Sequence, residues 1–113
     1  MNNKTLLLLL LVVLCLSGIA EAAQKIDVNA TLAACMACHD TSKAKKTLVG
    51  PPLFGVYGRK PQSPGLPFKK LDNAALDKWL SDPSAIKSDT QMAFKVADKT
   101  ERSKVIAALK TLK

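Results

Sequence analysis

The apolar positions of this chain form one continuous run near the start and three helix-like stripes further on. Residues 6–16 are almost entirely apolar, whereas later apolar residues recur at the three- and four-residue spacing of a single helix face. That spacing predicts helices over residues 26–37, 72–81 and 100–112. No segment alternates apolar and polar residues as a half-buried strand does, so we expect an all-α fold without a sheet.

Polar residues at the ends of these stripes mark where the helices begin and end. Asp27 or Asn29 can cap the first helix, and Asp98 or Thr100 can cap the last. Pro83 ends the second helix, because the residue before a proline disfavours helical backbone. The three predicted helices are therefore bounded by their own sequence signals.

Residues 40–71 form a long stretch with no helical pattern. It is rich in Gly, Ser and Lys, and its prolines forbid a continuous helix: Pro51, Pro52, Pro61, Pro64 and Pro67. A loop of about thirty residues is unusual in a small domain unless something organises it. We therefore expect this stretch to wrap around a ligand.

The start of the chain has the layout of a secretory signal peptide. Lys4 precedes the apolar run, and the small-x-small sequence at residues 20–22 suits cleavage. The run is short for a membrane span. We predict a signal peptide at residues 1–22, one domain at residues 23–113, and export to the periplasm or beyond. An uncleaved membrane anchor is the alternative.

Charge favours an acidic protein partner. The chain has 17 Lys and Arg against 9 Asp and Glu, a net charge of +8. Lys4 and Glu21 cancel within the predicted signal, so the domain keeps that charge. Charge complementarity mainly raises the rate of encounter between proteins. No basic helix with interleaved aromatic residues is present, so we do not expect nucleic-acid binding.

The candidate chemistry lies in the sequence Cys35-Met36-Ala37-Cys38-His39. Cys-x-x-Cys-His is the attachment sequence of c-type haem. Each thiol can form a thioether with one haem vinyl group, and His39, the chain's single histidine, can bind the iron. The sequence therefore predicts one haem c, covalently bound through Cys35 and Cys38.

Two other readings of the cysteine pair are weaker. A thioredoxin-like dithiol normally lies near a βαβ pattern, and no such pattern is visible. A structural zinc site usually needs four Cys or His ligands, and only three such residues follow the predicted signal.

The second axial ligand to the iron can be Met, His, Lys or water, and the chain has no further histidine. Of the methionines after the predicted signal, Met36 lies between the two cysteines and cannot reach across the ring, so Met92 is the candidate, although a lone methionine can also simply fill a gap in the core. A thioether opposite an imidazole favours Fe(II) and raises the reduction potential. It also fills the coordination sphere, which argues for electron transfer over catalysis.

At this point the chain resembles a known family, the class I c-type cytochromes. Residues 50–60 (GPPLFGVYGRK) are similar to the family's GPxLxGxxGRK segment. Residues 79–83 (WLSDP) are similar to its aromatic-Leu-x-Asn-Pro helix end, Met92 follows at the family spacing, and residues 101–110 resemble its final helix. The likeness runs from about residue 27 to the end of the chain.

The resemblance implies a cytochrome c fold, three to four helices with long loops around one covalent haem. It implies a monomeric one-electron carrier between respiratory or dehydrogenase partners, with no enzyme activity and no small-molecule substrate. Two alternatives stay open. The chain could be a fixed haem subunit of a dehydrogenase or sulfur-oxidising complex, or a haem-based small-ligand sensor. An apolar patch at the haem edge would favour the fixed subunit, and a mixed charged rim the carrier.

The resemblance also implies roles for residues around the haem. The Pro51 carbonyl accepts a hydrogen bond from the His39 imidazole, Arg59 and Thr90 bind the haem propionates, and Trp79 packs beside the methionine ligand. The chain departs from the family where other members carry a propionate-bonding tyrosine and tryptophan. Phe68 and Leu71 stand there and have no hydrogen-bond donor on their side chains.

Overall fold

A computed structural model of the chain describes residues 2–4 and 24–113, so most of the predicted signal peptide lies outside the described residues. Within them the structure is all-α, as predicted, with no strand. The elements are α2 (Val28–Leu32), the 3-10 helix η1 (Cys35–Ala37), α3 (Asn73–Ser81), α4 (Pro83–Ile86) and α5 (Lys99–Thr111). No helix in this part of the chain is long and apolar enough to cross a membrane.

An aspartate caps the start of each of these α-helices. Its carboxylate accepts a hydrogen bond from the backbone N–H three residues later and satisfies one of the helix's unpaired donors. The distances are 3.0 Å at Asp27, 3.0 Å at Asp72, 3.3 Å at Asp82 and 2.8 Å at Asp98. Asp27 and Asp98, and not Asn29 or Thr100, are therefore the caps of the first and last helices.

The continuous first helix predicted over residues 26–37 is wrong. It stops at Leu32 and resumes as the tighter helix η1. The backbone oxygen of Cys38 accepts a hydrogen bond from the distant Gly50 N–H at 2.9 Å, and Cys38 N–H donates back to Cys35 at 3.1 Å. These tertiary and 3-10 bonds replace the α-helical pattern around the two cysteines.

The short helix α4 has no counterpart in the sequence prediction. Asp82 and Pro83 do end α3, as expected, but Pro83 is also the first residue of α4. Proline suits that position, because the first N–H of a helix has no partner within the helix. The same dipeptide therefore ends one helix and begins another.

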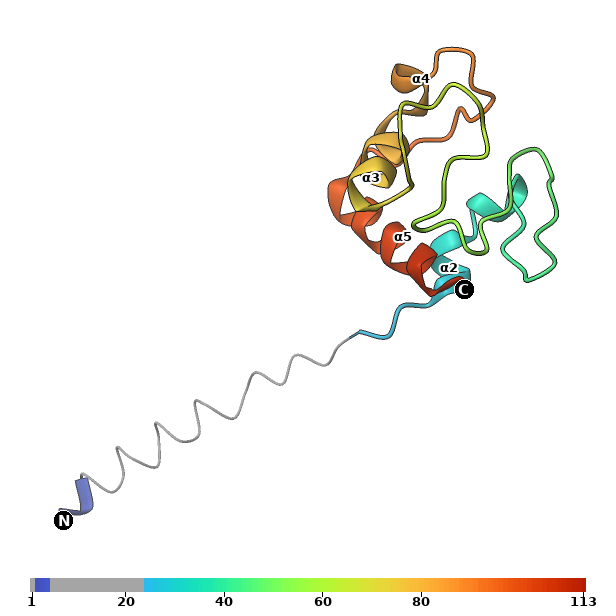
Figure 1. The fold of residues 1–113 in the computed structure, drawn as a ribbon. Coiled ribbons are helices and arrows are strands. Elements are labelled where there is room, and N and C mark those ends of the chain that lie inside the picture. The colour runs from blue at the N-terminus through green and yellow to red at the C-terminus, as the bar shows by residue number, and fades with distance from the viewer. Residues whose placement is uncertain (1, 5–23) are drawn as a thin grey trace.

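Helix α5 packs against both α2 and α3 and forms the centre of the helical core (Figure 1). Leu32 of α2, Leu76 of α3 and Ala108 of α5 are 0%, 4% and 0% exposed. The other buried apolar residues of the core are Val56, Leu71, Leu80, Val105, Ile106 and Leu109. Leu76, Leu80, Val105 and Leu109 of this core also line a cavity, so the core itself forms one wall of a site.

The loops lie on one side of the helices in Figure 1. The loop that precedes α3 is tied to itself by Gly58 N–H, which donates to Leu71 at 2.8 Å, and to the end of the chain by Gly55 N–H, which donates to Leu112 at 2.7 Å. Gly55 and Gly58 have φ of +75° and +81°, a backbone region that favours glycine. The loops therefore form the opposite wall of the site.

Candidate haem site

A cavity of about 560 Å³ lies between the helices and the loops. Its size is in the range of cavities that hold drug-sized or cofactor-sized ligands. All eight predicted site residues line it: Cys35, Cys38, His39, Pro51, Arg59, Trp79, Thr90 and Met92. Helix η1, the loop before α3, helix α3 and the segment after α4 thus contribute to one site.

The His39 imidazole is held by the loop that follows it. Its Nδ1 lies 2.6 Å from the backbone oxygen of Pro51. A carbonyl can only accept, so Nδ1 donates and the lone pair of Nε2 is left to bind a metal. A Cβ placed on Gly50 would lie 2.3 Å from Cε1 of the imidazole. Glycine at position 50 is therefore required for the ring to lie where it does.

The two thiols lie beside this imidazole on the same wall. Cys35 is partly buried, and burial raises the pKa of its thiol. Cys38 is exposed, and neither sulfur is in a disulfide. Within one short helix and the residues that follow it, two free thiols and one imidazole line the same cavity.

Met92 lines the cavity from the segment after α4. Its Sδ accepts a hydrogen bond from Trp79 Nε1 at 3.2 Å, and its backbone N–H donates to Thr90 Oγ1 at 3.1 Å. These two contacts fix the methionine from α3 on one side and from its own turn on the other. Hydrogen bonds with neutral groups therefore hold the Met92 thioether sulfur on the cavity wall.

Arg59 places a positive charge on the cavity wall. Its guanidinium donates to the backbone oxygens of Pro52 at 2.5 Å and Phe54 at 3.3 Å. Its Nε is buried and has no hydrogen-bond partner. Burial also lowers the pKa of the guanidinium. A buried donor without a partner is costly, and a bound acceptor would satisfy it.

These features fit a c-type haem. The thiols suit thioether bonds, imidazole and thioether suit the iron, and the unpartnered Arg59 donor suits a haem carboxylate. Among residues 2–4 and 24–113, no group of three or more His, Cys, Asp and Glu side chains is arranged to hold a metal ion.

Sequence reasoning missed two charged residues of the site. Lys87 and Asp89 line the cavity next to Thr90. Lys87 had counted only toward the positive charge of the chain. The sequence offered one signal that Lys87 belongs to the site: it lies five residues before Met92, on the same segment.

The chain is similar in sequence and in structure to cytochromes c2, which are c-type cytochromes. The chain is 36% identical to cytochrome c2 iso-1 of Rhodospirillum centenum, over 68% of this chain and 86% of that protein. It is 33% identical to cytochrome c2 of Pararhodospirillum photometricum, over 86% of this chain and 100% of that protein. The solved structure of cytochrome c2 from Rhodospirillum centenum matches with a TM-score of 0.63 at 30% identity, covering 75% of this chain and 94% of that one. No family model matches.

Proposed function

The chain belongs to the class I c-type cytochromes and carries one covalent c-type haem, and from that premise we propose that it is a one-electron carrier with His39 and Met92 as axial ligands. The observation that carries the proposal is that these two side chains line the same cavity. When bound, the haem supplies an iron that cycles between Fe(III) and Fe(II). The protein's residues hold and tune that iron.

The proximal wall supplies attachment and the first ligand. Cys35 and Cys38 form the thioethers, and His39 presents Nε2 while Nδ1 donates to the Pro51 carbonyl. A carbonyl partner fixes the orientation of the ring and makes the imidazole a stronger ligand. The close approach of Gly50 supports this role, because it leaves the imidazole no alternative position on that side.

The distal wall supplies the second ligand. Trp79 donates to Met92 Sδ and Thr90 accepts from the Met92 backbone, so both orient the thioether. The Thr90 hydroxyl can still donate its own hydrogen, and with Arg59 it is suited to bind a haem carboxylate. A thioether ligand favours Fe(II) and leaves no open coordination site. This supports electron transfer without enzyme activity and without a small-molecule substrate.

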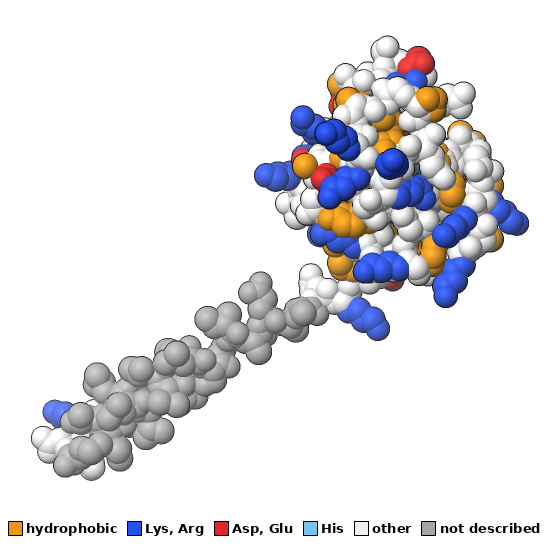
Figure 2. Space-filling view, viewed as in Figure 1, with side chains coloured by type: hydrophobic (Ala, Val, Ile, Leu, Met, Phe, Trp, Pro, Cys, Tyr) orange, Lys and Arg blue, Asp and Glu red, His pale blue; other side chains and the backbone are white. Residues whose placement is uncertain are grey.

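The carrier acts outside the cytoplasm as a monomer. Residues 1–22 serve as the export signal and residues 23–113 form the domain. Lys and Arg side chains are spread over the visible face of the domain, and few Asp and Glu lie between them (Figure 2). This distribution suits brief, charge-guided contacts with redox proteins that present acidic docking surfaces.

A fixed haem subunit of a larger complex is the second candidate. Val49 and Phe94 line the cavity and are 66% and 50% exposed, which gives its mouth an apolar component. The same mouth carries Asp89, whose side chain is 78% exposed. Because apolar and charged groups share the rim, the free carrier is the better-supported function.

The test is substitution of Met92→Ala in the holoprotein. The oxidised protein should lose the charge-transfer band of a methionine–ferric-haem bond at the red end of the visible spectrum, and the ferrous protein should gain rapid carbon monoxide binding. Met36→Ala, between the same two cysteines, is the control and should change neither. Absence of the band in the unsubstituted protein would exclude Met92 as the ligand, and its rapid carbon monoxide binding would favour a sensor.

A further inference from the structure

Lys87 is a partly buried lysine on the wall of the haem cavity. Its side chain is only 21% exposed, whereas that of Lys95, further along the same segment, is 57% exposed. Its backbone N–H closes α4 by donating to Pro83 at 2.9 Å. Its Cε lies 3.7 Å from the position that a Cβ on Gly65 would take, so the aliphatic stem lies near the loop before α3. The aliphatic stem thus packs against that loop, while the ammonium lies beside Asp89 on the cavity wall.

Asp89 is the anionic partner of Lys87 among the described residues, and it is itself largely exposed to solvent. Nζ lies 2.5 Å from Asp89 Oδ1, and the Asp89 side chain is 78% exposed. The hydrogen bond from Lys87 lowers the pKa of the Asp89 carboxyl, so this partner is ionised at neutral pH. An ion pair with such an exposed carboxylate contributes little to stability. It uses one of the three N–H donors of the ammonium, so donors remain for a second anion in the cavity.

The cavity itself is poor in negative charge. Arg59, Lys87 and Asp89 are its charged side chains among the described residues, and its other titratable groups are His39 and the two thiols. Haem brings two carboxylates into such a site. Leu71, which resembles a family position with an indole donor, is buried on the cavity wall and offers none. A haem carboxylate therefore needs a partner that the family pattern does not supply.

We propose that Lys87 is the cationic partner of one haem carboxylate and that Asp89 competes with that carboxylate for its ammonium. This assignment rests on the proposed haem site. A nearby ammonium favours the ionised carboxylate and keeps its pKa low. The same positive charge favours Fe(II), because reduction removes one positive charge from the iron. Lys87 thus sets both the ionisation of the carboxylate and the reduction potential.

The test is a spectroscopic redox titration of the holoprotein from acid to neutral pH. Lys87→Gln should lower the reduction potential and move the pH at which the potential starts to fall upward by about one unit or more. Asp89→Asn should do the reverse, because it frees the ammonium for the haem carboxylate. Lys87→Arg should stay near the unsubstituted protein.

Lys104→Gln is the matched control. Lys104 also forms a close ion pair, 2.7 Å from Glu101, but its side chain is 56% exposed on α5 and does not line the cavity. Equal effects of Lys87→Gln and Lys104→Gln would overturn the proposal. If Lys87→Gln fails to yield holoprotein, the Asp89→Asn variant provides the test. A redox titration of that variant identical to that of the unsubstituted protein would overturn the proposal. Failure of the axial ligand assignment would appear separately, as a missing methionine–iron band in the unsubstituted protein.

Discussion

The helical half of this protein, α2, α3 and α5, is built differently from its loop half, residues 38–71 and 87–97. The apolar stripes of the helical half bury one another, and aspartates cap its helices. The loop half faces α3 and α5 across a cavity of about 560 Å³. The difference shows that the first half folds around its own side chains and the second around a cofactor.

Local hydrogen bonds order parts of the loop half independently of the cofactor. The Asp40 carboxylate accepts hydrogen bonds from the backbone N–H groups of Lys46 at 2.7 Å and Ser42 at 2.9 Å. These bonds, that of Lys46 first, lower the pKa of the Asp40 carboxyl. Such turns order a few residues each, but they bury little apolar surface and cannot close the site.

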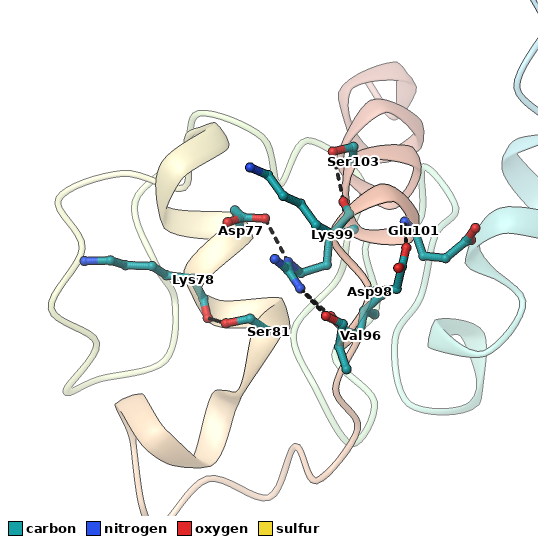
Figure 3. A network of polar contacts seen from close by, with 10 residues as sticks. Asp77, Lys78, Ser81, Val96, Asp98, Lys99, Glu101 and Ser103 are labelled. Atoms are coloured by element: carbon teal, nitrogen blue, oxygen red, sulfur yellow. Dashed lines mark hydrogen bonds and ion pairs between the residues drawn. The ribbon is translucent and has the colours of Figure 1, made fainter.

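Arg102 joins the two halves. It is 9% exposed, and its Nε donates to Asp77 Oδ1 on α3 at 2.8 Å. One guanidinium nitrogen also donates to the backbone oxygens of Val96 at 3.0 Å and Ala97 at 2.7 Å. Figure 3 shows Asp77 on α3 and Val96 in the segment just before α5, and the dashed lines from both mark their hydrogen bonds with Arg102. One side chain thus ties both packed helices to the end of the Met92 segment.

Loss of haem should produce the largest difference in stability between the two halves. Without haem, the apolar side chains that line this cavity of about 560 Å³ lose their packing partners, and the loops lose their main contact with the helices. In Cys35→Ala/Cys38→Ala protein purified without haem, amide protons of the loop half should lose hydrogen-exchange protection. Those of α3 and α5 should retain part of theirs. Equal protection in both halves would contradict the comparison.

Gly50→Ala should be the most damaging single substitution tested in the loop half. The added Cβ would overlap the His39 imidazole at 2.3 Å, and overpacking of this kind should cost about 3 kcal/mol of unfolding free energy. Gly58→Ala is the control, because its Cβ would meet nothing within 4 Å and only the φ of +81° is strained. That strain should cost about 1 kcal/mol. Denaturant unfolding of the two holoproteins measures both losses of unfolding free energy. Equal losses for the two variants would show that the His39 imidazole moves aside freely.

Arg102→Ala should weaken the junction between the halves by a smaller amount. Loss of charged hydrogen bonds to Asp77 and two carbonyls should cost about 2 kcal/mol. Lys104→Ala, on the exposed side of the same helix, should leave the unfolding midpoint unchanged. If the junction links the halves as described, Arg102→Ala also weakens the methionine–iron band before global unfolding begins. A midpoint shift without that early loss would make Arg102 a support of the helical half alone.

The sequence by itself determined the features of this protein that are set by residues close together in the chain. The helical stripes gave α3 and α5 to within one residue at each end, because periodicity and caps act over a few positions. Cys35, Cys38 and His39 indicated the haem at once, since attachment chemistry requires those residue types in that spacing. The family resemblance then supplied the partners of His39 across the loop.

Only the tertiary structure decided features that depend on pairings between distant residues. The first helix stops at Leu32, which no local signal at residues 33–34 foretells, and the Cys38 carbonyl pairs with the distant Gly50 N–H. The Arg59 guanidinium donates to two backbone carbonyls, and its buried Nε has no partner among the described residues. In the sequence Lys87 resembles any surface cation, whereas in the fold its side chain is partly buried and lines the cavity. In each case burial and long-range hydrogen bonding set the outcome, and both depend on how the loops close around the cavity.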